Sequence, residues 1–542
     1  MRHRTPSGKS IRSRRASRAE YHEDLKPNLK RLIKSFYNET YTERLGQIES
    51  SVVTLLWSLT TALYFPGGMI GAFAAGFLAD KVGRNRAIML SHIFAFIGAG
   101  LSTACVAMKA PELLMLGRFV TGINCGFATQ LVPMYLAEIT PYNLRGAFGT
   151  GHQLFVTIGI FMGSVFGIKE LLGTASGWPY LLLLNAVPAF VSLVFLPFIP
   201  ESPRFLMIIK NKRIAAEKAL RFYRQNADVS ADIEEMDTEC TTADEGDTTE
   251  AESYTMKKLL MTKELRMPLF IAVMLQVMQQ FSGINAVFFY STGIYKSAGV
   301  EPYQIPYAVV ITNFVNVLMT VIAVPIMDKA GRRPLLLYPM GVMVIVLGVM
   351  TMSLNLQHIA WMSYMSIMAV IVYVICFAVG LGPIPMMIGA ELFRQGPRPR
   401  AMSIIGLTNW LCTTVVALSF EMIQSAMQEF TFLIFLVFMI IFTLFVYWKV
   451  PETKQKTFEE IASQFQPGGE IEVEEIVEDD VFEDVTTEAS QMLKGHGGSA
   501  NGSVGSCGNN QPQSGGDVPP MSGKEEKAKL TQSEENVCNL PT

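Results

Sequence analysis

Long apolar stretches without charged residues alternate with short polar segments along most of the chain. A bilayer-spanning helix needs about 20 mainly apolar residues. Core helices of a large soluble protein are the alternative, but such helices are shorter and amphipathic. The pattern therefore predicts an all-α membrane protein with eleven transmembrane helices, at 51–78, 87–108, 112–137, 148–168, 178–199, 267–292, 306–326, 334–354, 360–389, 401–423 and 429–449.

Composition supports a membrane protein. The 542 residues are 50% hydrophobic and only 17% charged, with a mean hydropathy of +0.30, whereas soluble chains carry about 25% charged residues. The seven cysteines show no paired spacing, and four lie inside predicted spans. We therefore expect neither a disulfide framework nor a metal site.

A hydrophilic, partly acidic stretch divides the spans into five and six, and a helix is predicted within it around 212–224. The predicted organisation is a basic arm with the first outer loop at 1–50, an N-terminal bundle at 51–204, a central loop at 205–266, a C-terminal bundle at 267–450 and a disordered tail at 451–542. Acidic and then Gly/Ser/Asn-rich composition is the reason for expecting disorder in the tail. Short basic loops at 81–86, 143–145, 329–333 and 394–400 predict that these loops, the central loop and the tail face the cytoplasm.

Three motifs of the first half recur in the same order in the second half, about 250 residues later. Asp80-Lys81-Val82-Gly83-Arg84 returns as Asp328-Lys329-Ala330-Gly331-Arg332, Ala137-Glu138 followed by Arg145 returns as Ala390-Glu391 followed by Arg398, and Pro200-Glu201-Ser202 returns as Pro451-Glu452-Thr453. A duplicated half is expected, with two parallel repeats facing a site at the membrane midplane, which is a transporter architecture.

Seven motifs follow one another in order along the chain: Gly-Phe-Leu-Ala-Asp-Lys-Val-Gly-Arg (76–84), Leu-Gly-Arg-Phe (116–119), Val-Pro-Met-Tyr-Leu-Ala-Glu (132–138), Pro-Glu-Ser-Pro-Arg-Phe-Leu (200–206), Gln-Gln-Phe-Ser-Gly-Ile-Asn (279–285), Gly-Pro-Ile-Pro (382–385) and Pro-Glu-Thr-Lys (451–454). In their joint order and spacing, the chain resembles the sugar porters of the major facilitator superfamily, and within them the animal facilitative glucose transporters, over about residues 36–465. This resemblance implies a major facilitator fold of two parallel-repeat bundles.

Carboxylates and arginines recur at the cytoplasmic span ends of both halves, where they can form ion pairs. The expected pairs are Asp80 with Arg84, Glu138 with Arg118 and Arg145, Glu201 with Arg204, Asp328 with Arg332 and Arg333, and Glu391 with Arg398, with Glu452 as a further member. The alternative is that isolated basic residues only fix topology, but topology depends little on acidic residues. The resemblance implies a cytoplasmic gate that latches the outward-open state.

Amide side chains are the candidates for substrate binding, because they both donate and accept hydrogen bonds without carrying charge. A neutral polyol needs both kinds of partner. The candidates are Gln153, Gln279, Gln280, Asn285, Asn316 and Asn409, which match sugar-contacting positions of the family, with stacking expected from aromatic residues such as Phe289 and Trp410. A lone membrane amide is more often an interhelical hydrogen-bonding group, and that interpretation is favoured for Gln130 and Asn313.

The segment from Gly380 to Pro385 interrupts a predicted span, because proline removes backbone donors. A packing kink is one interpretation. The resemblance implies a gating helix.

Coupling to protons usually needs a buried membrane carboxylate, and no Asp or Glu lies in the middle of a predicted span. Passive transport is therefore expected. No nucleotide-binding loop is found, so ATP-driven pumping is not expected. We also expect no enzyme activity, no cofactor and no nucleic-acid partner.

The chain departs from the family in two regions. Relatives carry a first membrane helix before the segment matching Phe36-Tyr37-Asn38-Glu39-Thr40, whereas residues 1–35 are strongly basic here. Apolar residues at helical spacing, among them Leu25 and Ile33, suggest an interfacial helix there, and a transport-incompetent variant is the other interpretation. Asn38 begins a glycosylation sequon.

The second departure concerns selectivity. Met386 stands where many glucose-selective members have Trp, and Ala378 replaces a Glu. Glucose, fructose or both remain candidate hexose substrates. The predicted function is facilitative hexose transport at the plasma membrane, with the lipid bilayer around the bundle and the tail as a candidate binding segment for cytoplasmic proteins. A sugar sensor that does not transport is the alternative, and an ion channel would need a charged pore ring that the sequence lacks. The sequence does not determine the oligomeric state.

Overall fold

The computed structural model describes residues 28–225, 228–244, 255–297, 299–357 and 359–465. The chain divides into a unit ending at Ile476 and a second unit, Val477–Thr542. The second unit lies wholly outside the described residues.

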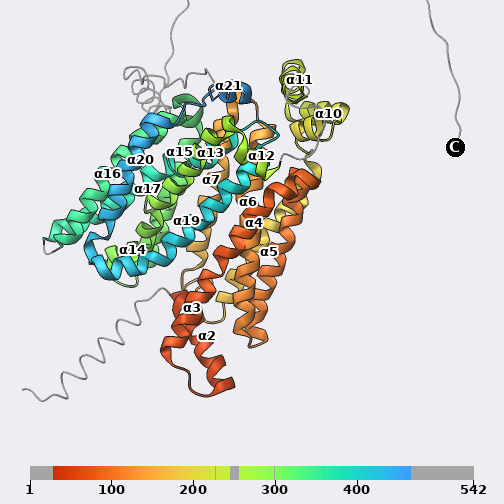
Figure 1. The fold of residues 1–542 in the computed structure, drawn as a ribbon. Coiled ribbons are helices and arrows are strands. Elements are labelled where there is room, and N and C mark those ends of the chain that lie inside the picture. Colours follow the sequence, from red (N-terminus) through yellow and green to blue (C-terminus); the bar gives the residue numbers. More distant parts are fainter. Residues whose placement is uncertain (1–27, 226–227, 245–254, 298, 358, 466–542) are drawn as a thin grey trace, which may run out of the picture. The chain divides into compact units, whose positions relative to one another are not determined.

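The first half contains α3 (Ser50–Ala62), α4 (Tyr64–Val82), α5 (Arg84–Ala107), α6 (Pro111–Ile139), α7 (Arg145–Phe166), α8 (Trp178–Leu183) and α9 (Ala186–Phe195) (Figure 1). The second half contains α13 (Lys263–Phe281), α14 (Ile284–Ser297), α15 (Ile305–Ala330), α16 (Arg332–Asn355), α17 (Ala360–Val379), α18 (Ile384–Glu391), α19 (Arg398–Met427) and α20 (Thr431–Lys449). Every predicted span is helical, and the described residues contain no β-strand.

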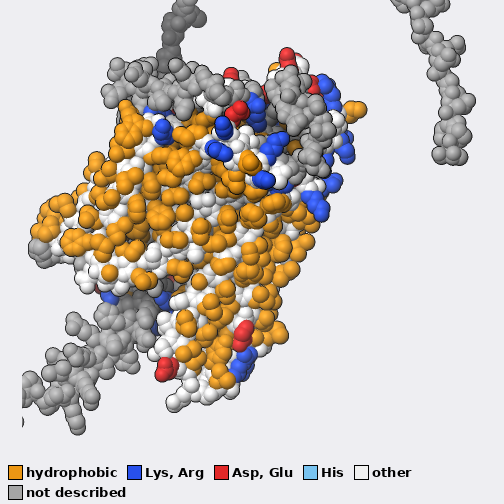
Figure 2. All heavy atoms as spheres, in the orientation of Figure 1, with side chains coloured by type: hydrophobic (Ala, Val, Ile, Leu, Met, Phe, Trp, Pro, Cys, Tyr) orange, Lys and Arg blue, Asp and Glu red, His pale blue; other side chains and the backbone are white. Residues whose placement is uncertain are grey.

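Nine helical segments of the described residues are long and apolar enough to cross a membrane. They include four segments that each join consecutive helices, Ser50–Val82, Trp178–Phe198, Lys263–Lys296 and Trp361–Glu391. The two remaining predicted spans form α6 and α7, which carry more polar side chains, such as Gln130 and Gln153. Hydrophobic side chains cover the middle of the face in Figure 2, and charged ones gather toward its ends.

The two halves pack through corresponding helices. In the order of the repeat, α4 corresponds to α15 and α7 corresponds to α19; α4 packs along α19 and α7 along α15. Small residues allow such helices to approach closely. A Cβ atom on Gly76 of α4 would lie 2.1 Å from the carbonyl oxygen of Pro399, so this crossing requires glycine.

One end of the bundle, here named the charged end, carries α10 (Arg213–Tyr223), α11 (Ser230–Asp244), α12 (Met256–Met261) and α21 (Phe458–Ser463), at the top of Figure 1. The helix predicted around 212–224 is confirmed as α10. The disorder predicted from residue 451 is wrong for 451–465, where Glu452 is buried and Phe458 of α21 is 2% exposed. The rest of the predicted tail, from 466, lies outside the described residues.

At the opposite end, α2 (Asn28–Leu45) forms part of the region predicted to be a basic arm. Ile33 and Tyr37 are buried in a cluster with Trp178, and the Tyr37 hydroxyl is hydrogen-bonded to Thr60. Glu43 pairs with Lys109 at 2.7 Å, and Arg44 with Glu112 at 3.0 Å. The helical spacing read from the sequence is thus present in the structure, although Leu25 lies outside the described residues.

Candidate functional site

The repeated Pro-Glu motifs cap two helices at the charged end. The Oε1 atom of Glu201 accepts hydrogen bonds from the backbone nitrogens of Arg84 and Asn85, at 2.8 and 3.0 Å. Glu452 does the same for Arg332 and Arg333, at 3.0 and 2.9 Å. The first N–H groups of a helix have no partner within the helix, and its N-terminus favours negative charge. Each carboxylate therefore satisfies the start of a neighbouring helix, α5 in one half and α16 in the other.

The repeated glycine makes this capping possible. Gly83 and Gly331 directly precede α5 and α16 with φ of 99° and 87°, a region that favours glycine. A Cβ atom would lie 2.4 Å from Glu201 Oε2 in the first case and 2.7 Å from Glu452 Oε2 in the second. Both the backbone conformation and the space exclude a side chain.

A buried arginine–glutamate pair accompanies each cap. The Nε atom of Arg84 lies 3.0 Å from Glu138, and Nη2 of Arg332 lies 3.0 Å from Glu391. Ser202 donates to Glu138, and Thr453 donates to Glu391 at 2.6 Å. Charges removed from water in this way need such partners, and losing one partner destabilises a fold strongly.

Other contacts at the charged end connect the two halves. Gln395 Nε2 donates to Glu138 Oε1 at 3.0 Å, and Arg398 Nη1 lies 3.8 Å from the same oxygen. Arg400 pairs with Asp80 at 3.2 Å. In the opposite sense, Asp328 of the second half accepts from the backbone nitrogen of Ala147, at the start of α7, at 3.0 Å. These contacts must break if the halves separate at this end.

Phe458 was missed by the sequence analysis. Its ring lies beneath the guanidinium groups of Arg145, Arg204 and Arg398, whose centres are 4.0, 4.8 and 3.9 Å from the ring centroid. Cation–π contact strengthens when the partners are desolvated. The available signal was the apolar spacing of Phe458 and Ile461 directly after the Pro-Glu-Thr-Lys motif.

Several predicted pairs have other partners. The predicted Glu138–Arg118 pair is wrong, because both lie on α6 and 20 residues of helix span about 30 Å; Arg118 lies over the ring of Tyr64 instead. Arg204 binds Glu235 at 2.7 Å and not Glu201.

The pairs expected for Arg145 and Glu391 also differ. Arg145 donates to the carbonyl of Lys456 rather than to Glu138. Glu391 forms an ion pair with Arg332, and Arg398 forms one with Glu138. Asp80 with Arg84 at 3.9 Å and Asp328 with Arg332 at 3.8 Å are confirmed.

Amides from α13, α14 and α19 form one connected group, here named the amide cluster. Asn285 Nδ2 donates to Gln280 Oε1 at 3.0 Å, and Gln280 Nε2 lies 3.4 Å from Gln279 Oε1. Asn409 Nδ2 donates to Gln279 at 2.9 Å and to Gln276 at 2.8 Å. Four of the six predicted amides therefore meet, and Gln276 is a further member that was not among the candidates.

The other two predicted amides are placed separately. Gln153 of α7, in the first half, lies next to Gly382 in the second half. Its Nε2 atom would be 3.4 Å from a Cβ atom built on Gly382. Asn316 of α15 is buried, and no described residue donates to its Oδ1. A buried polar atom without a partner is costly, so this oxygen is suited to a ligand hydroxyl or water.

The predicted apolar contacts are only partly described. Trp410 lies against Gly68 of α4 and Tyr64, with its indole N–H directed at Thr129 Oγ1 at 3.3 Å. Met386 is buried in α18. Phe289 belongs to α14, but its side chain lies outside the described part of the chain. Asn38 is exposed on α2.

The two amides assigned to helix packing fit that role. Asn313 Nδ2 donates to Ser164 of α7 at 2.6 Å. Gln130 is fully buried, and its amide packs so closely against Gly406 of α19 that a Cβ atom on Gly406 would overlap it.

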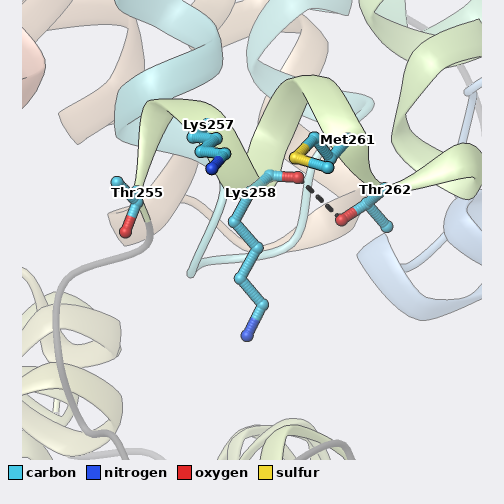
Figure 3. A pocket seen from close by; sticks show the side chains of 5 residues that line it. All are labelled: Thr255, Lys257, Lys258, Met261 and Thr262. Carbon is cyan, nitrogen blue, oxygen red and sulfur yellow. Dashed lines mark hydrogen bonds between the residues drawn. The ribbon is translucent and has the colours of Figure 1, made fainter.

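A surface hollow at the charged end is separate from the amide cluster. Figure 3 shows the residues that line it, which come from α12 and its flanks: Thr255, Lys257, Lys258, Met261 and Thr262. It contains none of the candidate substrate residues.

Comparison with known proteins gives consistent relatives. A family model described as "Sugar (and other) transporter" matches residues 28–465. The chain is 42% identical to facilitated glucose transporter member 1 of solute carrier family 2 from Gallus gallus over 441 residues, 81% of this chain and 89% of the relative. Identity to member 3 from Ovis aries is 42% over 437 residues, 80% of this chain and 87% of the relative.

A solved structure gives the same fold. The proton:xylose symporter XylE of E. coli, bound to 6-bromo-6-deoxy-D-glucose, superposes with a TM-score of 0.69 at 24% identity, over 82% of this chain and 97% of the symporter. At this identity the match establishes the major facilitator fold alone.

Proposed function

Because the chain belongs to the sugar transporter family of the major facilitator fold, and is thus a multi-pass membrane protein that transports sugar, we propose that it is a facilitative uniporter of hexoses that works by alternating access. Glucose, fructose or both are the substrates. The plasma membrane is the site of transport.

The amide cluster is the observation that carries this proposal. A hexose presents several hydroxyl groups that each donate and accept, and amides complement both functions. Gln279, Gln280, Asn285 and Asn409 are joined by hydrogen bonds within the apolar bundle, with Gln153 nearby from the other half. Groups from both halves around one sugar would allow the same site to be reached from either side.

Uniport is proposed from the location of the carboxylates. In the described spans, Asp80, Glu138, Asp328 and Glu391 lie in the last turn of their helices, and each is engaged by an arginine or a helix N-terminus. Glu112 and Glu264 lie in the first turn of α6 and α13, and Glu421 lies in the second-last turn of α19. A proton-coupling carboxylate would be expected nearer the middle of the membrane. The relatives at 42% identity are named facilitated transporters, whereas the symporter is the more distant match.

Uptake in cells that lack endogenous hexose transport tests the proposal. We expect saturable uptake of labelled glucose or fructose, counterflow when the cells are preloaded, and no change when the proton gradient is collapsed. Binding without flux would support a sensor instead. Uptake that requires the proton gradient would refute uniport.

A further inference from the structure

The helix break between α17 and α18 leaves one carbonyl without its helical donor. The first helix ends at Val379 and the second begins at Ile384. In an α-helix the carbonyl of Leu381 would accept from the nitrogen of residue 385. Residue 385 is proline and has no N–H. The buried carbonyl of Leu381 therefore needs a donor from elsewhere.

Gln279 supplies that donor from α13. Its Nε2 atom lies 2.9 Å from the carbonyl oxygen of Leu381 and 2.8 Å from that of Gly382. Its Oε1 atom accepts from Asn409 at 2.9 Å. The amide nitrogen is thus hydrogen-bonded to the helix break, and the amide oxygen is hydrogen-bonded to the amide cluster.

We infer that Gln279 is a positioning residue that couples sugar occupancy to movement of the α17–α18 break, an inference that rests on the proposed hexose transport. With the site empty, the amide holds both carbonyls, and moving the break would leave Leu381 without a donor in an apolar bundle. A sugar hydroxyl can accept from Nε2 and donate to the carbonyl at the same time. The loaded carrier can therefore release the break without exposing an unpaired group, whereas the empty carrier cannot.

The kinetic consequence is that the empty carrier reorients more slowly than the loaded one. Equilibrium exchange involves only loaded carriers, whereas zero-trans uptake also needs the empty carrier to return. The maximal rate of exchange should therefore exceed that of zero-trans uptake in the parent protein. Gln279→Met keeps the length of the side chain and removes both hydrogen-bonding functions, so the ratio of the two rates should fall to about one.

Gln280→Met is the matched control. Gln280 is hydrogen-bonded to Gln279 and Asn285, whereas the two carbonyls of the break accept their hydrogen bonds from Gln279. We expect a raised KM with the parent ratio of exchange to zero-trans uptake. A merely structural role of Gln279 would lower both rates together and leave their ratio unchanged.

Pro385→Ala provides a second route that leaves Gln279 intact. It restores the N–H at residue 385, so the carbonyl of Leu381 gains a donor that the sugar does not displace. The empty carrier can then move the break without leaving that carbonyl unpaired, so zero-trans uptake should rise and the ratio of exchange to zero-trans uptake should fall to about one. A parent ratio of about one, or a parent ratio retained by both Gln279→Met and Pro385→Ala, would overturn the inference. A parent protein without hexose uptake would instead refute the proposed function.

Discussion

Among the described residues of the charged end, Glu138 is the carboxylate that contacts two side chains of the other half, so Glu138→Gln is the substitution chosen to weaken the gate. Within its own half it binds Arg84 and Ser202. Across the halves it accepts from Gln395 at 3.0 Å and lies 3.8 Å from Arg398. Only the second set is lost when the halves separate, and a perturbation shifts an equilibrium only through such differential contacts.

The magnitude follows from those two contacts. A hydrogen bond to a charged group is worth about 1 kcal/mol more than a neutral one. Charges about 4 Å apart interact by roughly 4 kcal/mol at an effective dielectric constant of 20, of which we retain about half because desolvation of both charges in the closed gate offsets part of the attraction. Glu138→Gln should thus weaken closure by about 2–3 kcal/mol, which is roughly 30- to 140-fold in the open-to-closed ratio.

Cysteine labelling measures that ratio. Ser403 of α19 is fully buried and accepts from the backbone nitrogen of Gly76 at 3.2 Å, so it lies under the closed gate. Ser403→Cys, in a protein whose seven native cysteines are replaced, should react with a soluble thiol reagent from the charged end only when the halves part. The labelling rate should rise in Glu138→Gln by the factor given above.

Glu112→Gln is the matched control at the other end of the same helix. Glu112 makes an exposed pair with Arg44, and exposed pairs contribute little. Its labelling rate should equal that of the parent. If Glu138→Gln also labelled at the parent rate while reaching the membrane normally, the cross-half contacts of Glu138 would not hold the gate closed.

Much of the architecture was predictable because a bilayer imposes length and polarity on each helix. The repeat of Asp-Lys-x-Gly-Arg with Pro-Glu also identified the residues of the charged end correctly. It did not identify their partners, since these depend on which helices adjoin. Arg204, for example, finds Glu235 only because α11 folds back beside it.

The amides show the same limit. Their residue types and spacing predicted a shared polar site, and four of them are joined. The use of Gln279 as a donor to the helix break depends on α13 lying beside α18, which no local pattern reveals. Gln276 was not among the binding candidates, because its contact is with Asn409, which is far away in the sequence.

Three further outcomes are expected. Gln280→Ala should strongly reduce hexose uptake at unchanged surface expression, because it removes both partners that a hydroxyl would use; unchanged uptake would remove Gln280 from the site. Gly331→Ala should lower the thermal stability of the purified protein by several degrees, since the added methyl meets Glu452 and the positive φ disfavours alanine; Gly341→Ala, where a Cβ meets open space, serves as the control. Asn38→Gln should abolish a glycosidase-sensitive shift in apparent mass if α2 faces the outside, and an identical shift in both proteins would place the sugar elsewhere.

The division of hydrogen bonds at the charged end indicates how the halves move. The caps made by Glu201 and Glu452, and the pairs of Arg84 and Arg332, close entirely within one half. Breaking these contacts would leave buried charges unpaired, so each half is held as a rigid body. The charges released by the contacts between halves can be solvated at the membrane surface once water enters. Separation at this end therefore costs little compared with deforming either half, which favours a rocking of two intact bundles over rearrangement within one.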